Sequence, residues 1–266
     1  MAWSLALSVG ALLSGCGLWR PTTVPMRTVS LEATCKTKPS TLLVFLPGSY
    51  SLPEDYVSHG FVDSVRQRHI AADIVLVDAH LGYYSERTIL DRLQLDVIDP
   101  ARAAGYRRIW LIGISVGAYG AMLHSAASAD RAAGVEGIVA IAPYLGERRV
   151  SASIEASGGL ARWRAPPRSA TTGIDDDLLW QWLQARASRR PEPNLYLGYG
   201  DRDRFAFSDR LLAAELPSTH VFIASGGHDW PVWERVWQQM LPALPLSADA
   251  SCRAKQFRSQ DPRVVD

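Results

Sequence analysis

The sequence predicts an α/β fold, in which a mostly parallel central sheet is flanked by helices. Three observations favour it. Short apolar runs alternate with helical patterns along most of the chain, an order that is typical of βα units. The apolar runs are unbroken, as expected for strands that are covered on both faces. One run ends at Gly113-Ile114-Ser115-Val116-Gly117, where a tight turn between a strand and a helix would present a serine.

Each expected strand is a short apolar run that ends at polar or turn-forming residues. The strands are expected at residues 41–46, 73–77, 108–112, 137–142, 194–199 and 219–224. Helices are expected between or after them, at residues 61–68, 85–104, 116–129, 177–187, 209–214 and 231–241. Consecutive strands joined by helices run parallel, so their carboxyl ends would share one edge of the sheet.

The composition is that of an ordinary globular protein. Of the 266 residues, 47% are hydrophobic and 21% are charged, and the net charge is +1. A chain of this length can bury one large core or form at most two domains. Because the net charge is near zero, we expect no nucleic-acid partner and no preference for acidic partners.

The first residues resemble an export signal. Residues 2–13 form an apolar run that is short for a bilayer span, and it ends in Leu13-Ser14-Gly15-Cys16. This ending resembles a bacterial lipobox, although no Lys or Arg precedes the run. The resemblance implies that residues 1–15 are removed as a signal peptide and that Cys16 is lipidated. We therefore expect an exported lipoprotein, anchored on a cell-envelope membrane and facing the periplasm or lying on the outer membrane.

The rest of the chain divides by composition. Residues 16–40 are Pro- and Thr-rich, and we expect them to form a tether between anchor and domain. Residues 41–245 carry the alternating pattern and form the domain, and residues 246–266 form a C-terminal tail. The interval 146–173 is rich in Gly, Ser, Arg and Pro and is long for a connection. With the helix that follows, it predicts a small cap insertion at about residues 146–190.

Three tryptophans in this insertion have two interpretations. Trp163, Trp180 and Trp182 could belong to a partly ordered cap over a pocket. Alternatively, they anchor the insertion to the core, as large apolar side chains commonly do.

The cysteines fit an exported protein. If Cys16 carries lipid, Cys35 and Cys252 remain. In an oxidising compartment, two such cysteines favour a disulfide. The alternative is two unrelated thiols.

The turn serine has candidate partners in two later loops. A serine hydroxyl near neutral pH needs a base to accept its proton, and the base needs an orienting carboxylate. Asp203 follows the fifth expected strand and His228 follows the sixth. Because these strands end at one edge of the sheet, Ser115, Asp203 and His228 can converge.

This order of serine, acid and histidine resembles that of the α/β-hydrolases, over residues from about 41 to 241. The loop Gly227-His228-Asp229-Trp230 is similar to that of esterase-D-like and feruloyl-esterase-like members. The resemblance implies that Ser115 is the nucleophile and His228 the base, while Asp229 would begin the next helix as its N-cap. It favours Asp203 as the acid, and Asp201 remains the alternative.

The resemblance also implies two amide donors for a developing oxyanion. One is the N–H of Val116, directly after the nucleophile. The other comes from the turn after the first expected strand, where family members often have His-Gly and this chain has Pro47-Gly48. We expect Ser49 to supply it, with Gly48 and Tyr50 as alternatives.

No set of histidines or cysteines has metal-ligand spacing, and no dinucleotide-binding fingerprint is visible. We therefore expect neither a metal nor a cofactor. The sequence predicts a serine hydrolase that cleaves small-molecule carboxylic esters through an acyl-enzyme. The alternatives are an acyltransferase or thioesterase with the same triad, or a non-catalytic envelope binding protein on a hydrolase scaffold.

Overall fold

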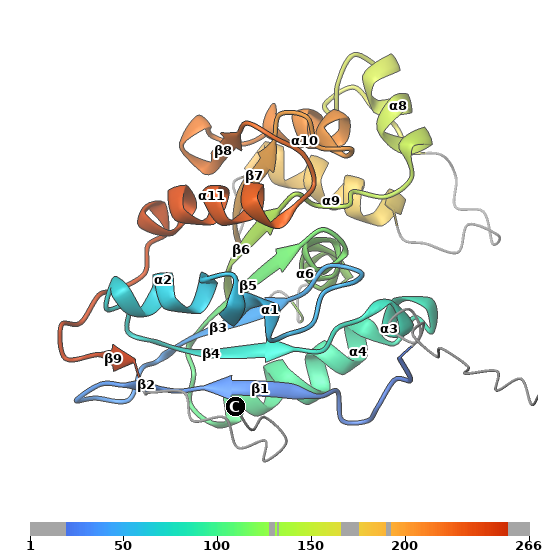
Figure 1. The fold of residues 1–266 in the computed structure, drawn as a ribbon. Helices are drawn as coiled ribbons and strands as arrows, with labels where there is room; N and C mark the ends of the chain where they lie inside the picture. The colour runs from blue at the N-terminus through green and yellow to red at the C-terminus, as the bar shows by residue number, and fades with distance from the viewer. Residues whose placement is uncertain (1–19, 128–130, 132, 166–175, 190–192, 255–266) are drawn as a thin grey trace, which may run out of the picture.

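The computed structural model describes residues 20–127, 131, 133–165, 176–189 and 193–254. Its central sheet has seven strands in the order β1-β4-β3-β5-β6-β7-β8 (Figure 1). All neighbouring pairs are parallel except β1 and β4. The strands span Thr28–Leu31 (β1), Thr41–Leu46 (β3), Ala72–Val77 (β4), Arg108–Ile114 (β5), Val135–Ile141 (β6), Asn194–Gly200 (β7) and Val221–Ala224 (β8). The predicted α/β fold with a mostly parallel sheet is confirmed.

Helices cover both faces of this sheet. On one face, α1 (Asp55–Ser58), α2 (Phe61–Gln67) and α11 (Trp230–Met240) pack on one apolar cluster. The other cluster includes residues of α3 (Leu81–Ser85), α4 (Ile89–Leu93), α5 (Asp99–Ala103), α6 (Val116–Ala127), α8 (Arg148–Ala156), α9 (Asp176–Arg189) and α10 (Ala206–Ala213). Short 3₁₀ turns span Ser218–His220 and Leu241–Ala243. All six residues of β3 are buried between the two layers, which explains its unbroken apolar run.

The single helix expected at residues 85–104 is divided. The chain forms α3, then α4, a π-helical segment at Gln94–Ile98, and α5. Pro100 lies in the first turn of α5 and has no N–H to continue the α-helical hydrogen bonds. Pro100 therefore lies next to a local change in hydrogen-bond pattern, and the chain stays helical from Ile89 to Ala103. The break in the expected helix lies between α3 and α4, where Arg87 has a left-handed φ of +57°.

The segment expected to be a tether is folded onto the domain from Arg20 onward. Strand β1 pairs antiparallel with β4 at the sheet edge, and the amide of Met26 donates to Asp96 at 2.8 Å. Residues in β1 alternate between exposed and half-buried, a weak pattern that explains why the sequence did not reveal it. Residues 1–19, which include the predicted signal peptide and Cys16, lie outside the described residues.

The predicted C-terminal tail also begins inside the fold. Strand β9 (Arg253–Ala254) pairs antiparallel with β2 (Ala33–Thr34). Beside this pair, Cys35 and Cys252 form the disulfide that the sequence favoured. Both ends of the domain are thus joined to each other, through a covalent bond and a short ladder. Residues 255–266 lie outside the described part of the chain.

The insertion contains α8 and buried tryptophans. The indole N–H of Trp163 donates to Ser153 at 2.9 Å, and that of Trp180 donates to the Leu145 carbonyl at 2.9 Å. Both rings are almost fully buried, so these two residues anchor the insertion. Residues 166–175 lie outside the described residues, and coverage of a pocket by the insertion stays a prediction.

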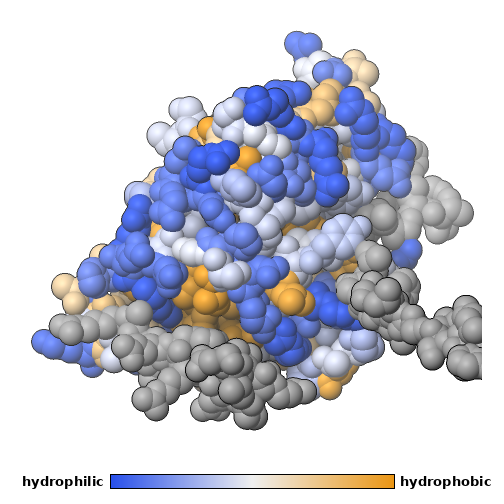
Figure 2. Space-filling model, viewed as in Figure 1, coloured by the Kyte–Doolittle hydropathy of each residue, from blue (hydrophilic) through white to orange (hydrophobic). Residues whose placement is uncertain are grey.

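The face shown in Figure 2 is mainly hydrophilic, with small separate apolar areas. Large apolar side chains that are exposed in the described residues are Val24, Tyr50, Leu52, Leu95 and Ile223. Among the described helices, none is both long enough and apolar enough to cross a bilayer.

Candidate active site

Ser115 lies in the sharp turn between β5 and α6. Its φ is +55°, a left-handed value that a serine adopts at a steric cost. The glycines on either side make the turn possible. A Cβ at Gly113 would lie 2.3 Å from the amide nitrogen of Ala118, and a Cβ at Gly117 would lie 2.1 Å from the carbonyl oxygen of Leu46. The motif therefore brings three backbone segments together around the serine.

The structure brings Ser115, His228 and Asp203 into one chain of hydrogen bonds. The Nε2 atom of His228 lies 3.1 Å from the hydroxyl oxygen of Ser115. The Nδ1 atom lies 2.8 Å from a carboxylate oxygen of Asp203. Because an ionised carboxylate can only accept, this contact places the imidazole proton on Nδ1 and leaves Nε2 free to accept the serine proton. The arrangement can transfer a proton from the hydroxyl to the ring.

The two acidic residues that the sequence left open have different partners. The Asp203 side chain is fully buried, and its second oxygen accepts the Phe205 amide at 2.8 Å. Asp201 instead accepts the amide of Gly226 at 2.8 Å. Asp203 therefore contacts the imidazole, whereas Asp201 joins the loop after β7 to the loop that carries His228.

Aromatic side chains enclose the His228 ring. Phe205 and Trp233 meet it edge-on, with ring centroids at 5.0 and 5.1 Å. Asp229 is the N-cap of α11, and its side chain accepts the Val232 amide at 3.1 Å, as the sequence predicted. The imidazole is thus held by packing on two sides and by hydrogen bonds at both nitrogens.

The turn after β3 lies beside the serine. A Cβ at Gly48 would be 3.7 Å from the Ser115 Cβ, and the Ser51 amide closes the turn on the Gly48 carbonyl at 3.2 Å. Within the described residues, the amides of Ser49 and Tyr50 have no backbone acceptor. Val116 is the first residue of α6, so its amide has no acceptor within the helix. The Gly48 amide also has no backbone acceptor among the described residues, so Gly48, Ser49 and Tyr50 all remain candidate donors beside Val116.

Asp209 is a residue of this region that sequence reasoning missed. It lies in α10 with no exposed surface, and neither carboxylate oxygen has a partner among the described residues. Burial, and to a smaller extent the charge of Asp203, raises the pKa of this carboxyl well above its usual range. In the sequence it resembles any polar residue of an amphipathic helix, and no signal distinguishes it.

The other histidines are engaged elsewhere. His59 pairs with Glu234 at 2.6 Å, His124 with Gln94 at 2.9 Å, and His220 with the Leu195 carbonyl at 3.0 Å. His69 lies 2.9 Å from the Cys252 carbonyl, and His80 caps the start of α3. In the described part of the chain, no cluster of three or more histidine, cysteine or acidic side chains could hold a metal ion.

No protein-family model matches the sequence. No curated protein matches it either. Solved structures do resemble the fold. An S-formylglutathione hydrolase from Staphylococcus aureus superposes with a TM-score of 0.52 at 15% identity, over 78% of this chain and 82% of that one.

Two further structures give similar values. A ferulic acid esterase superposes with a TM-score of 0.52 at 15% identity, over 81% of this chain and 96% of that one. A putative esterase from Staphylococcus aureus superposes with a TM-score of 0.53 at 11% identity, over 87% of this chain and 84% of that one. These superpositions show a shared α/β-hydrolase fold. At identities this low, a shared fold does not by itself show a shared activity.

Proposed function

We propose that this protein is a serine hydrolase that cleaves carboxylic esters through an acyl-enzyme intermediate. The observation that carries the proposal is the continuous chain from the Ser115 hydroxyl through His228 to Asp203. Residues from three separate strand ends form it, and a binding scaffold has no need of a proton path between them. Acyl transfer also needs donors for the oxyanion, and the adjacent turn supports this part of the proposal, because the Ser49 and Tyr50 amides have no backbone acceptor among the described residues.

In the proposed reaction, the Ser115 oxygen attacks the acyl carbon while His228 Nε2 accepts the hydroxyl proton. Asp203 holds the ring and stabilises the imidazolium that forms. The amides of Val116 and Ser49 donate to the tetrahedral oxyanion. The imidazolium then gives its proton to the leaving alcohol, and the acyl group stays on Ser115. Water activated by the same imidazole releases the acid and restores the serine.

A preference for esters has separate support. The solved structures with the same fold are described as an S-formylglutathione hydrolase, a ferulic acid esterase and a putative esterase. Each of these names belongs to its own protein. Together they favour hydrolysis of a small ester or thioester over cleavage of an amide in this chain.

A fluorophosphonate probe tests the proposal directly. Wild-type protein should be labelled at Ser115, and Ser115→Ala should not be labelled. A series of p-nitrophenyl esters of increasing acyl length then measures turnover and defines the acyl preference. Folded wild-type protein that neither reacts with the probe nor cleaves any ester would favour the non-catalytic envelope binding role.

We further propose that Cys16 is lipidated and holds the protein on a cell-envelope membrane. The support is the Leu13-Ser14-Gly15-Cys16 sequence alone. Detergent partitioning of protein expressed in a bacterium tests it, with Cys16→Ser as the control. Wild-type protein should enter the detergent phase and the variant should not. A wild-type N-terminal peptide without lipid would contradict the proposal.

A further inference from the structure

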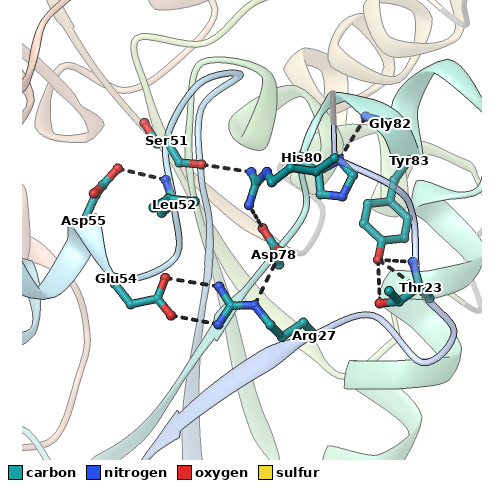
Figure 3. A network of polar contacts seen from close by, with 11 residues as sticks. Thr23, Arg27, Ser51, Leu52, Glu54, Asp55, Asp78, His80, Gly82 and Tyr83 are labelled. Atoms are coloured by element: carbon teal, nitrogen blue, oxygen red, sulfur yellow. Dashed lines mark hydrogen bonds and ion pairs between the residues drawn. The ribbon is translucent and has the colours of Figure 1, made fainter. Parts of the chain in front are cut away.

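The turn after β3 is held from outside by the N-terminal segment. One guanidinium nitrogen of Arg20 pairs with Asp78, which directly follows β4. The other nitrogen donates to the carbonyl of Ser51 at 3.3 Å. Figure 3 shows Ser51 and Asp78 within the same polar network. Arg20 therefore connects the carboxyl end of β4 to the turn that lies beside Ser115.

The peptide group between Ser51 and Leu52 is fixed at both of its ends. Arg20 donates to the Ser51 carbonyl, and the Leu52 amide donates to the Asp55 carboxylate at 2.8 Å. The Ser51 amide closes the turn on Gly48. These three contacts orient the turn and leave the amides of Ser49 and Tyr50 without a backbone acceptor in the described residues.

Arg20 is itself held in place. The side chain of Asp78 is 13% exposed and that of Arg20 is 25% exposed, so their ion pair is partly shielded from water. The segment after Arg20 is tied to α3, because the Thr23 amide donates to the Tyr83 hydroxyl at 3.0 Å. We call Arg20, with its contacts to Asp78 and to the Ser51 carbonyl, the clamp. The clamp holds the Ser51 carbonyl more firmly than a solvated surface arginine would.

Arg27 provides a natural comparison. Its Nε donates to the other oxygen of Asp78 at 3.4 Å, and its guanidinium forms two hydrogen bonds to Glu54, at 2.8 and 3.1 Å (Figure 3). It thus shares the Asp78 carboxylate with Arg20, while its remaining hydrogen bonds go to Glu54 rather than to the Ser51 carbonyl. The two arginines differ in whether they reach the turn.

We propose that Arg20 is a positioning residue for the oxyanion-binding turn, an inference that rests on the proposed ester hydrolysis for its catalytic consequence. Arg20 fixes the Ser51 carbonyl and so holds the amides of Ser49 and Tyr50 toward Ser115. It acts through the turn and touches no reacting atom. The N-terminal segment is then part of the catalytic unit.

The test compares Arg20→Gln with Arg27→Gln. In Arg20→Gln we expect kcat for a p-nitrophenyl ester to fall by about 10- to 100-fold with KM within about threefold, because a displaced donor weakens transition-state stabilisation. Affinity for a boronic acid that mimics the tetrahedral state should fall in parallel. Arg20→Lys should recover part of the loss, since an ammonium keeps the charge and loses the two-pronged geometry. Arg27→Gln should keep kcat within about threefold.

Amide hydrogen exchange provides a readout that does not depend on activity. Exchange in a peptide covering residues 48–52 should accelerate in Arg20→Gln and stay unchanged in Arg27→Gln. Wild-type protein without esterase activity would refute the proposed function, while exchange would still report on the clamp. Equal effects of both substitutions on kcat and exchange, or an unchanged turn in Arg20→Gln, would overturn the positioning role. Thermal unfolding of each variant shows that the comparison is made on folded protein.

Discussion

Gly117 approaches Leu46 so closely that a Cβ on the glycine would lie 2.1 Å from the leucine carbonyl oxygen. The first turn of α6 therefore rests directly on the backbone that leads into the turn after β3. Val116 is the first residue of α6, and Ser49 lies in the turn after β3. The close contact therefore limits how far apart the elements that carry these two candidate donors can lie.

We predict that Gly117→Ala is strongly destabilising. The neighbouring atoms belong to the backbone of Leu46 and Pro47, so they cannot turn aside as a flexible side chain would. Forcing a methyl group into such a site costs about 1–3 kcal/mol or more. Urea unfolding of Gly117→Ala should show this loss. Gly48→Ala is the control for stability, because its nearest contacts would be ordinary ones at 3.7 Å. Equal stability of Gly117→Ala and wild type would contradict this close approach of the two segments.

The second prediction separates the two acids of the loop after β7. Asp203→Asn should lower kcat by about 10²- to 10⁴-fold, because an amide no longer stabilises the imidazolium and favours the wrong tautomer. Asp201→Asn should change kcat by less than about threefold, since its side-chain oxygen can still accept the Gly226 amide. Initial rates with one p-nitrophenyl ester measure both. A larger loss in Asp201→Asn than in Asp203→Asn would assign the acid to Asp201.

The sequence predicted the sheet well, because the apolar pattern that identifies a buried strand lies within the strand itself. Strand β3 was expected at residues 41–46 and occupies them, since a strand buried on both faces has an unbroken apolar run. Ser115, Asp203 and His228 could be brought together because parallel strands end at one edge. Strand β1 was missed, because four residues of alternating burial at a sheet edge give little signal.

Contacts between distant segments leave no pattern in the sequence. Arg20 and Ser51 are 31 residues apart, and only the folded chain shows that they meet. Asp201 and Asp203 are two residues apart in one loop, and only the folded chain shows that Asp203 contacts the imidazole while Asp201 accepts a backbone amide. Asp209 is buried by packing around α10, although its sequence neighbours resemble those of a surface helix.

The third prediction concerns the disulfide. Cys35 and Cys252 are 217 residues apart, so their bond closes a loop that includes most of the domain. Removing it in a Cys35→Ser, Cys252→Ser double variant should lower the free energy of unfolding by about 2–5 kcal/mol, because the unfolded chain gains freedom. Thermal unfolding without reductant measures the loss. Peptides that contain these cysteines should react with an alkylating agent only after reduction, and reaction without reduction would mean that the bond is absent.

The fourth prediction is a loss of stability in acid that depends on His124. Burial lowers the pKa of this histidine from 6.5 to about 4, with smaller contributions from the charges of Arg131 and Arg102. The unfolded state therefore binds the proton more tightly than the folded state, so stability falls as the pH drops from about 6.5 to about 4. The full effect is about 3 kcal/mol. Urea unfolding at pH 7 and pH 4.5 should show a smaller decrease in His124→Gln than in wild type. Parallel decreases would show that His124 is not the source.

The last prediction has the opposite dependence on pH and concerns Asp209. Its pKa is raised by burial and by Asp203, an effect that Arg210 opposes, while Tyr199 is a further titratable neighbour. The folded state therefore binds this proton more tightly than the unfolded state, so the contribution of Asp209 to stability is greatest in acid. It declines by up to about 1.4 kcal/mol per pH unit above pH 4 until the folded-state pKa is reached.

Asp209→Asn removes this dependence because an amide does not titrate. The stability of Asp209→Asn relative to wild type should therefore increase steadily from pH 5 to pH 7, whatever hydrogen bonds the amide gains or loses. Urea unfolding of both proteins across this range gives the difference. A difference that stays constant would mean that the Asp209 carboxylate is already ionised in the folded protein at pH 5. A buried charge beside Asp203 would then need a compensating partner, since two adjacent carboxylates without one repel each other in a site with little water.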